Sequence, residues 1–290
     1  MCNVLISAMQ PSNFHSHCTF CDGRSHPEEY VTSALSRHFR AYGFSSHSPL
    51  PFETCWNMPV GDMPEYLREI ERLKVKYSGR IEIYLGLEID YLDKTYHASI
   101  PYFQSLPLDY RIGSIHFLPW RTPLTEDHMT AIDGAYDIFA QTVRERYRGD
   151  IRLITKDYFE STLQMIDAGG IDIVGHMDKI YMNGSLYPGF DRSADWFRKP
   201  FEACIDLIAE KGLIVEINTK NRSRKQQTYP HTDTLKQLLQ RHIPIMVNSD
   251  CHVPDFVNDG REETLALLKE TGFRTTRELT AGVWQDIAIE

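Results

Sequence analysis

Short apolar runs and longer amphipathic stretches alternate along the chain. The apolar runs have the length and composition of buried strands. The sequence predicts seven strands, at residues 12–16, 41–46, 81–87, 110–115, 171–175, 213–217 and 244–248. The stretches between them space their apolar residues as helices do, and predict helices at 27–39, 64–77, 135–148, 158–168, 196–211, 232–241 and 262–271. This alternation is typical of a parallel β/α architecture.

The chain has 290 residues, of which 42% are hydrophobic, enough to bury a large core. It contains no internal repeat, no low-complexity tract and no long Pro, Gly or Ser linker between predicted elements. We therefore predict a single domain over residues 1–290.

Side chains able to bind metal stand at or just after the carboxyl ends of six predicted strands. They are His15, His17, His47, Glu88, His116, His176, Asp250 and His252. In a β/α barrel, this end of the strands is the catalytic face. An open doubly wound sheet would instead place its ligands near one switch point between two strands. Ligands on so many strands favour a closed barrel.

The spacing of the histidines predicts a multinuclear metal site. His15 and His17 lie two residues apart, so both rings project from the same face of a strand. Asp250 and His252 repeat this spacing at the last strand, which neighbours the first strand in a closed barrel. Imidazole and carboxylate together suit Zn, Fe or Mn, whereas Ca or Mg would take mostly oxygen.

Charge and cysteine content narrow the class of protein further. The formal net charge of −9 disfavours binding to nucleic acid. One short basic loop, residues 220–225, is better sized for a small phosphate. Six cysteines show no disulfide framework, which predicts a reducing compartment and hence a cytoplasmic protein. Cys18 and Cys21 form a Cys-x-x-Cys pair, for which a redox or structural-zinc role is a minor alternative.

These segments resemble the polymerase and histidinol phosphatase (PHP) superfamily, and within it the histidinol-phosphate phosphatases of the barrel type. The resemblance spans nearly the whole chain. It implies a distorted seven-stranded (β/α)7 TIM-like barrel with its metal site at the C-terminal end of the strands. The matching motifs are His15-Ser16-His17 with Asp22-Gly23, Ser46-His47-Ser48-Pro49, Gly86-Leu87-Glu88, Ser114-Ile115-His116, Gly175-His176-Met177-Asp178, Glu216-Ile217-Asn218-Thr219 and Ser249-Asp250-Cys251-His252.

The resemblance also implies two to three divalent or trivalent ions and distributes the ligands among them. Glu88 would bridge the first two ions, and Glu88 and Asp250 would be catalytic through a metal-bound hydroxide. The first ion takes His15, His17, Glu88 and Asp250, the second takes Glu88, His116 and His176, and the third takes Asp22, His47 and His252.

The implied reaction is hydrolysis of L-histidinol phosphate to L-histidinol and phosphate, a step of histidine biosynthesis. Arg222 or Arg224 is expected to hold the phosphate through bidentate hydrogen bonds. Asp178 and Glu216 are expected to orient their neighbours, for example by accepting the second ring N–H of a ligand histidine.

Other functions stay open at this point. A PHP-type phosphodiesterase or nuclease, or a phosphatase for another small phosphomonoester, would use the same metal ligands. A metal-loaded binding protein without turnover is a further alternative. Because a nuclease needs a basic or aromatic track, we favour a small phosphorylated substrate, without nucleic acid or membrane as partner. The sequence does not predict the oligomeric state.

Overall fold

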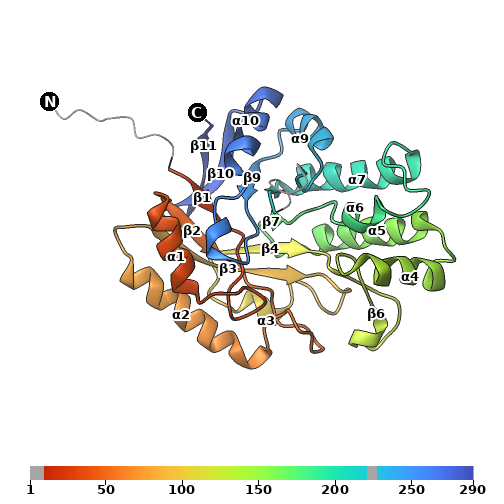
Figure 1. The fold of residues 1–290 in the computed structure, drawn as a ribbon, viewed down its shortest axis with the longest axis horizontal. Helices are drawn as coiled ribbons and strands as arrows, with labels where there is room; N and C mark the ends of the chain where they lie inside the picture. Colours follow the sequence, from red (N-terminus) through yellow and green to blue (C-terminus); the bar gives the residue numbers. More distant parts are fainter. Residues whose placement is uncertain (1–9, 221–226, 290) are drawn as a thin grey trace.

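The computed structural model describes residues 10–220 and 227–289. In this part of the chain, seven parallel strands form the central sheet, with helices packed around it (Figure 1). The strand order follows the chain: β1 (Ser12–Asn13), β2 (Ala41–Phe44), β3 (Glu82–Asp90), β4 (Tyr110–Ser114), β7 (Ile173–Val174), β8 (Ile214–Asn218) and β9 (Ile245–Asn248). All seven predicted strands are confirmed in position.

The sheet is nearly closed into a barrel, as predicted, because its first and last strands meet. Side chains make part of this junction: the backbone N–H of Phe14 donates to Oδ1 of Asn248 at 2.9 Å, and that of Ser249 donates to Oδ1 of Asn13 at 2.7 Å. Beyond the strand ends, the backbone N–H of His17 donates to Cys251 O at 2.9 Å. Strand β1 is shorter than predicted because asparagine side chains replace part of its backbone ladder.

The helices agree with the sequence pattern in place but differ at their ends. The helix predicted at 158–168 begins earlier, at Ile151, where the Asp150 side chain caps the backbone N–H of Arg152. The longer helices are α1 (Pro27–Ser36), α2 (Met63–Lys76), α4 (Tyr136–Arg146), α5 (Ile151–Ala168), α7 (Asp195–Lys211), α9 (Leu235–Gln240) and α10 (Arg261–Thr271). The short ones are α3 (Pro101–Gln104), α6 (Tyr181–Gly184), η1 (Val60–Asp62), η2 (Glu126–His128), η3 (Thr232–Thr234) and η4 (Pro254–Phe256).

Two antiparallel hairpins were not predicted. Strands β5 (Phe117–Pro119) and β6 (Met129–Ala131) pair within the connection after β4. Strands β10 (Thr275–Thr280) and β11 (Val283–Ala288) form a hairpin near the C-terminus. Strands β5 and β6 are too short to show an alternation of apolar and polar residues, and β10 is mostly polar. Neither hairpin therefore has the sequence pattern of a buried strand.

Tyr110 fills the barrel interior beneath the site. Its hydroxyl lies 2.6 Å from Phe14 O and 3.0 Å from Phe44 O, and so ties β4 to the first two strands. Gly86 makes room for this ring, because a Cβ there would lie 2.4 Å from Tyr110 Cζ. A larger apolar cluster packs the outer face of the sheet against the helices. In the described residues, no helix is both long and apolar enough to cross a membrane.

Candidate metal centre

The fold brings all nine predicted metal ligands together at the carboxyl ends of the strands. Each comes from the last residues of a strand or from the loop that follows it. Seven of the nine side chains are buried, while Asp22 and His252 are partly exposed: the buried ones are His15, His17, His47, Glu88, His116, His176 and Asp250. Buried charged groups of this kind require partners or metal ions.

The first group consists of His15, His17, Glu88 and Asp250. Nε2 of His15 lies 3.1 Å from Nε2 of His17 and 3.1 Å from Oε2 of Glu88. Nε2 of His17 lies 3.2 Å from Oδ1 of Asp250 and 3.5 Å from Oε2 of Glu88. Two atoms that each bind one ion at about 2.1 Å, in tetrahedral or octahedral geometry, lie about 3.0–3.4 Å apart. His15, His17 and Asp250 form one candidate metal-binding group, and Glu88 adjoins it through the two histidines.

Glu88 also faces a second group through its other oxygen. Its Oε1 lies 2.9 Å from Nε2 of His176 and 3.5 Å from Nε2 of His116. The hydroxyl of Ser114 donates to the same oxygen at 2.7 Å. The two oxygens of this one carboxylate thus serve different sets of histidines, as a bridging ligand does.

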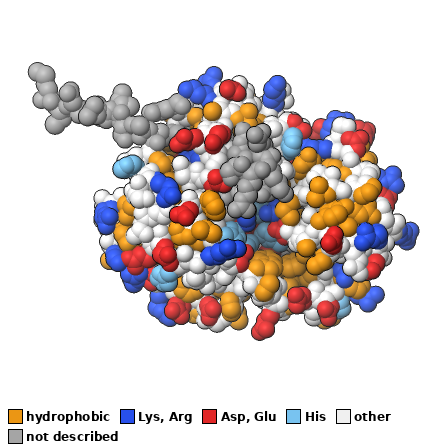
Figure 2. Space-filling view, viewed as in Figure 1, with side chains coloured by type: hydrophobic (Ala, Val, Ile, Leu, Met, Phe, Trp, Pro, Cys, Tyr) orange, Lys and Arg blue, Asp and Glu red, His pale blue; other side chains and the backbone are white. Residues whose placement is uncertain are grey.

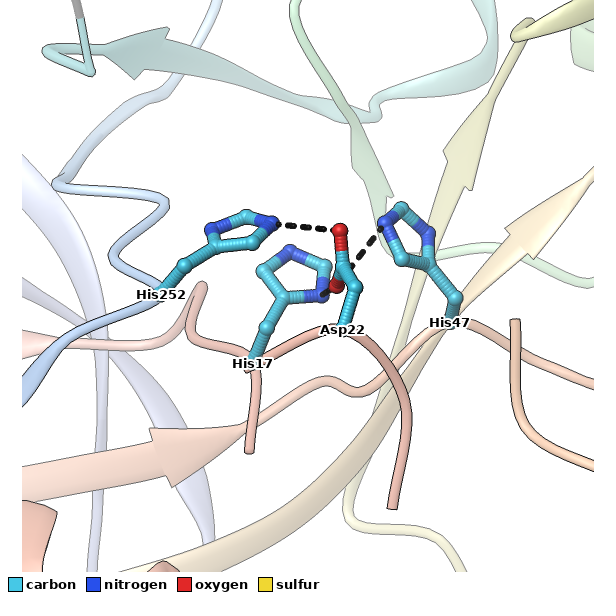
Figure 3. Close-up of side chains that lie close together, drawn as sticks. All are labelled: His17, Asp22, His47 and His252. Carbon is cyan, nitrogen blue, oxygen red and sulfur yellow. Dashed lines mark ion pairs between the residues drawn. The ribbon is translucent and has the colours of Figure 1, made fainter. Parts of the chain in front are cut away.

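The third group surrounds Asp22 (Figure 3). Oδ2 of Asp22 lies 3.1 Å from Nε2 of His252, and Oδ1 lies 3.8 Å from Nε2 of His47. His17 contributes here too, with Nδ1 3.7 Å from Oδ1 of Asp22. His17 and His47 therefore each face two groups through their two ring nitrogens, an arrangement that the sequence did not predict.

The donor atoms fit metal ions better than they fit one another. Four buried atoms of the nine predicted ligand residues lack a hydrogen-bond partner: Nδ1 of His176, Oδ1 of Asp22, Nδ1 of His47 and Oε2 of Glu88. The last two lie only 3.1 Å apart but are not aligned for a hydrogen bond. Leaving such groups unsatisfied costs about 1–3 kcal/mol each, more for charged groups. A cation bound between them would remove this cost.

Two carboxylates orient predicted ligand histidines by contacting the ring nitrogen Nδ1, which lies away from the neighbouring ligands. Nδ1 of His15 lies 2.6 Å from Oε1 of Glu216, and Nδ1 of His116 lies 3.0 Å from Oδ1 of Asp90. A hydrogen bond of this kind fixes the ring and leaves Nε2 free for a metal. The expectation for Glu216 is confirmed. Asp90 was missed, although it stands two residues after Glu88 on β3 and so shares its face.

Asp178 has a different partner from the one expected. Its Oδ2 accepts a hydrogen bond from Nη1 of Arg192 at 2.7 Å and another from the backbone N–H of His231 at 2.9 Å. No ligand histidine in the described residues donates to it. Asp178 thereby fixes the loop after β8 rather than a metal ligand.

The electrostatics of the cluster keep its carboxylates ionised. Burial raises the pKa of Glu88, but His15, His47 and His116 lower it by more, and the net pKa falls well below the usual range. Burial, together with His252 and His47, depresses the pKa of His17. Metal binding requires ionised carboxylates and neutral imidazoles. Burial lowers the pKa of His15 and of His116, but nearby carboxylates raise both by more, that of His116 to about 9, so a metal ion would displace a proton from each of these two rings.

A cavity of about 250 Å³ opens above the ligands. Figure 2 shows histidine side chains near the centre of this face, with hydrophobic side chains beside them. Besides predicted ligands, the wall of this cavity includes Trp56, Phe117, Asp133, Lys179 and Lys220. Sequence reasoning did not single out Asp133 or Lys179, because the chain pattern around them carries no motif.

The predicted phosphate ligands Arg222 and Arg224 lie outside the described residues. Lys220, the last described residue before them, points its ammonium at the ligands: Nζ lies 3.2 Å from Oδ1 of Asp250 and 3.4 Å from Nε2 of His252. Lys220 itself therefore lies on the cavity side of the barrel.

The Cys-x-x-Cys pair provides no ligand to the groups described above. Cys18 and Cys21 are both free thiols. Burial raises the pKa of Cys18 to about 11, which keeps the thiol protonated near neutral pH. The candidate metal groups among the described residues contain no cysteine. The geometry gives no support to a structural zinc at this pair.

Comparison with known proteins identifies the family. A Deinococcus radiodurans protein named probable histidinol-phosphatase is 27% identical over 268 residues, covering 90% of this chain and 94% of the relative. The histidinol-phosphatase of Bacillus subtilis is 27% identical over 262 residues, covering 84% and 94%. The crystal structure of histidinol phosphate phosphatase from Lactococcus lactis, complexed with zinc, L-histidinol and phosphate, has a TM-score of 0.73 at 22% identity, covering 96% and 100%. The model of the PHP domain matches residues 13–220, most of the chain, and the protein therefore belongs to the PHP domain family.

Proposed function

We propose that this protein is a metal-dependent phosphomonoesterase that hydrolyses L-histidinol phosphate to L-histidinol and phosphate. The observation that carries this proposal is the position of Glu88 between two histidine groups at the base of a small cavity. Relatives that align with 84 to 90% of the chain are named histidinol-phosphatases, which supports the choice of substrate.

The groups around Glu88 and Asp22 would hold two to three ions, for which Zn, Fe and Mn suit the donor set. The predicted ligands are His15, His17, Asp22, His47, Glu88, His116, His176, Asp250 and His252. Bound divalent ions would lower the pKa of a water molecule and neutralise charge on the phosphate oxygens.

The chain's own residues would prepare the site for this reaction. Water attacks phosphorus, the phosphorus–oxygen ester bond breaks, and the leaving oxygen takes up a proton. Glu88 and Asp250 supply the negative charge that gathers cations at the cavity base. Glu216 and Asp90 keep the rings of His15 and His116 oriented. Arg222 and Arg224 stay predicted phosphate ligands.

The cavity favours a small phosphomonoester over a nucleic acid. A nuclease needs a basic or aromatic track that leads to its metals. Lys179 and Lys220 line the described part of the cavity, but each faces a carboxylate, Asp133 and Asp250 respectively. A strand of nucleic acid would meet these carboxylates directly.

Phosphate release from a panel of substrates tests the proposal. The panel contains L-histidinol phosphate, two other phosphomonoesters and an oligonucleotide, each with added Zn, Mn or Fe. We expect kcat/KM to be highest for histidinol phosphate and to vanish after chelation. Preferred cleavage of the oligonucleotide would favour the nuclease alternative, and binding of metal without any turnover would favour the binding protein. A cytoplasmic location likewise remains a prediction.

A further inference from the structure

An ion pair lines the cavity beside the predicted metal ligands, and neither of its residues belongs to a candidate metal-binding group of the described residues. Nζ of Lys179 lies 3.4 Å from Oδ2 of Asp133, and both residues line the cavity. Lys179 belongs to the loop after β7 that carries His176, and Asp133 follows the hairpin strand β6. Two separate connections thus bring opposite charges to one side of the cavity.

Lys179 is a buried cation with spare hydrogen-bonding capacity. The residue is 4% exposed, and its ammonium has three donors. Its separation from Asp133 exceeds the roughly 2.7–2.9 Å of a well-formed charge-assisted hydrogen bond. Its ammonium therefore has donors left for an oxygen atom of a bound substrate.

Asp133 lies where the cavity wall becomes aromatic. Its side chain is 30% exposed, and Trp56 and Phe117 line the same cavity. These two rings stack, with centroids 5.5 Å apart and planes 24° from parallel. Trp56 also packs edge-on against the ring of His47, at 4.6 Å between centroids, so the aromatic wall starts at the metal ligands. A carboxylate beside an aromatic face suits an organic cation.

We propose that the Lys179–Asp133 pair recognises the charge pattern of the substrate. Lys179 contacts the phosphoryl group, and Asp133, which lines the cavity together with Trp56, contacts a cationic group on the alcohol part. The cavity would therefore select phosphomonoesters that carry a positive charge close to the phosphate. This inference rests on the proposed function, whose substrate has an amino group and an imidazole in that part of the molecule.

Two probes separate the two roles in the metal-loaded protein. Calorimetry measures the binding of L-histidinol, which lacks phosphate, and of inorganic phosphate, which lacks the cation. Loss of a charged hydrogen bond corresponds to about 10- to 100-fold in affinity. We expect Asp133→Asn to lower the affinity for L-histidinol by this factor and the affinity for inorganic phosphate by less than about threefold. Lys179→Met should show the opposite pattern.

Matched surface variants control for charge alone. Asp137→Asn, on the exposed side of α4, and Lys156→Met, on α5, make the same charge changes away from the cavity. Both should bind the two probes as the wild type does. Metal content and circular dichroism of every variant confirm that the site and the fold are intact.

The wild type provides a test that needs no variant. It should bind L-histidinol at least about tenfold more tightly than the same molecule without its amino group. Equal affinity for the two, or an Asp133→Asn variant that keeps wild-type affinity for L-histidinol, would overturn the inference. Hydrolysis of histidinol phosphate by the wild type would then still support the proposed function, whereas its absence would reject that function itself.

Discussion

Oε2 of Glu88 lies 3.1 Å from Nε2 of His15, although the two residues come from β3 and from the segment after β1. Both side chains are buried. On the far side of the His15 ring, Glu216 fixes Nδ1 and so directs Nε2 toward Glu88. This geometry holds two donor atoms in place for a cation.

The purified protein should carry two to three metal ions per chain, because three groups of ligand atoms have the spacing of coordination sites. Elemental analysis after gentle purification measures this number. Metal should also stabilise the fold, by about 2.7 kcal/mol at a free concentration 100 times Kd. One ion or fewer per folded chain, without any gain on reconstitution, would contradict the trinuclear arrangement.

Glu216→Gln should weaken metal binding without removing a ligand, because the amide holds Nδ1 of His15 less strongly than the carboxylate does. Loss of such a supporting group typically costs about 10- to 100-fold in metal affinity. Competition with a chromogenic chelator measures the change. Glu210→Gln, an exposed residue of α7, serves as the control. Unchanged affinity in Glu216→Gln would show that Glu216 does not support the site.

Gly86→Ala should destabilise the barrel, because the added methyl group would meet the Tyr110 ring at 2.4 Å. Overpacking of this kind costs about 1–3 kcal/mol. Gly61→Ala is the matched control, since a Cβ at that position meets nothing within 4 Å. Urea denaturation of both variants measures their free energies of unfolding and so tests this prediction. Equal free energies of unfolding for the two variants would mean that the Tyr110 ring moves aside at little energetic cost.

Glu278→Gln should destabilise the protein in a pH-dependent way. Burial raises the pKa of Glu278, but Arg261, Ser12 and Arg40 lower it by more, so the net pKa lies below the ordinary value of about 4.3. A depressed carboxylate pKa stabilises the fold above that pH, and this contribution disappears as the pH falls through the folded-state pKa.

At pH 7 the free energy of unfolding of Glu278→Gln should therefore be lower than that of the wild type by about 3 kcal/mol, because Glu278 is a buried partner of Arg261. This difference is the deficit of the variant. It should shrink below about pH 4.3. Glu270→Gln, on the exposed surface of α10, should show no such deficit. A deficit that stays constant with pH would exclude the ion pair as its cause.

The sequence predicted the strand ends and their ligands because both depend on local pattern. Strands β2 and β9 are short apolar runs and β3 is mainly apolar. His17, Glu88 and Asp250 stand where these or neighbouring strands deliver their side chains to one face. The same period-two rule would also have identified Asp90.

What the sequence did not predict depends on contacts between distant segments. Lys179 and Asp133 meet through two loops whose relative position the pattern does not encode. The β5–β6 hairpin is too short to show alternation, yet it leads directly to Asp133. His17 and His47 each face two ligand groups only because the strand ends converge.

The turnover of Glu88→Gln with histidinol phosphate, measured at saturating metal, tests the central claim most directly. The amide cannot supply the negative charge that Glu88 presents to both histidine groups. Loss of about 4 kcal/mol of transition-state stabilisation lowers kcat by about 10³-fold. We expect a loss of this size in a folded protein, and a smaller one in His47→Asn. A Glu88→Gln protein with near-normal kcat would contradict the account.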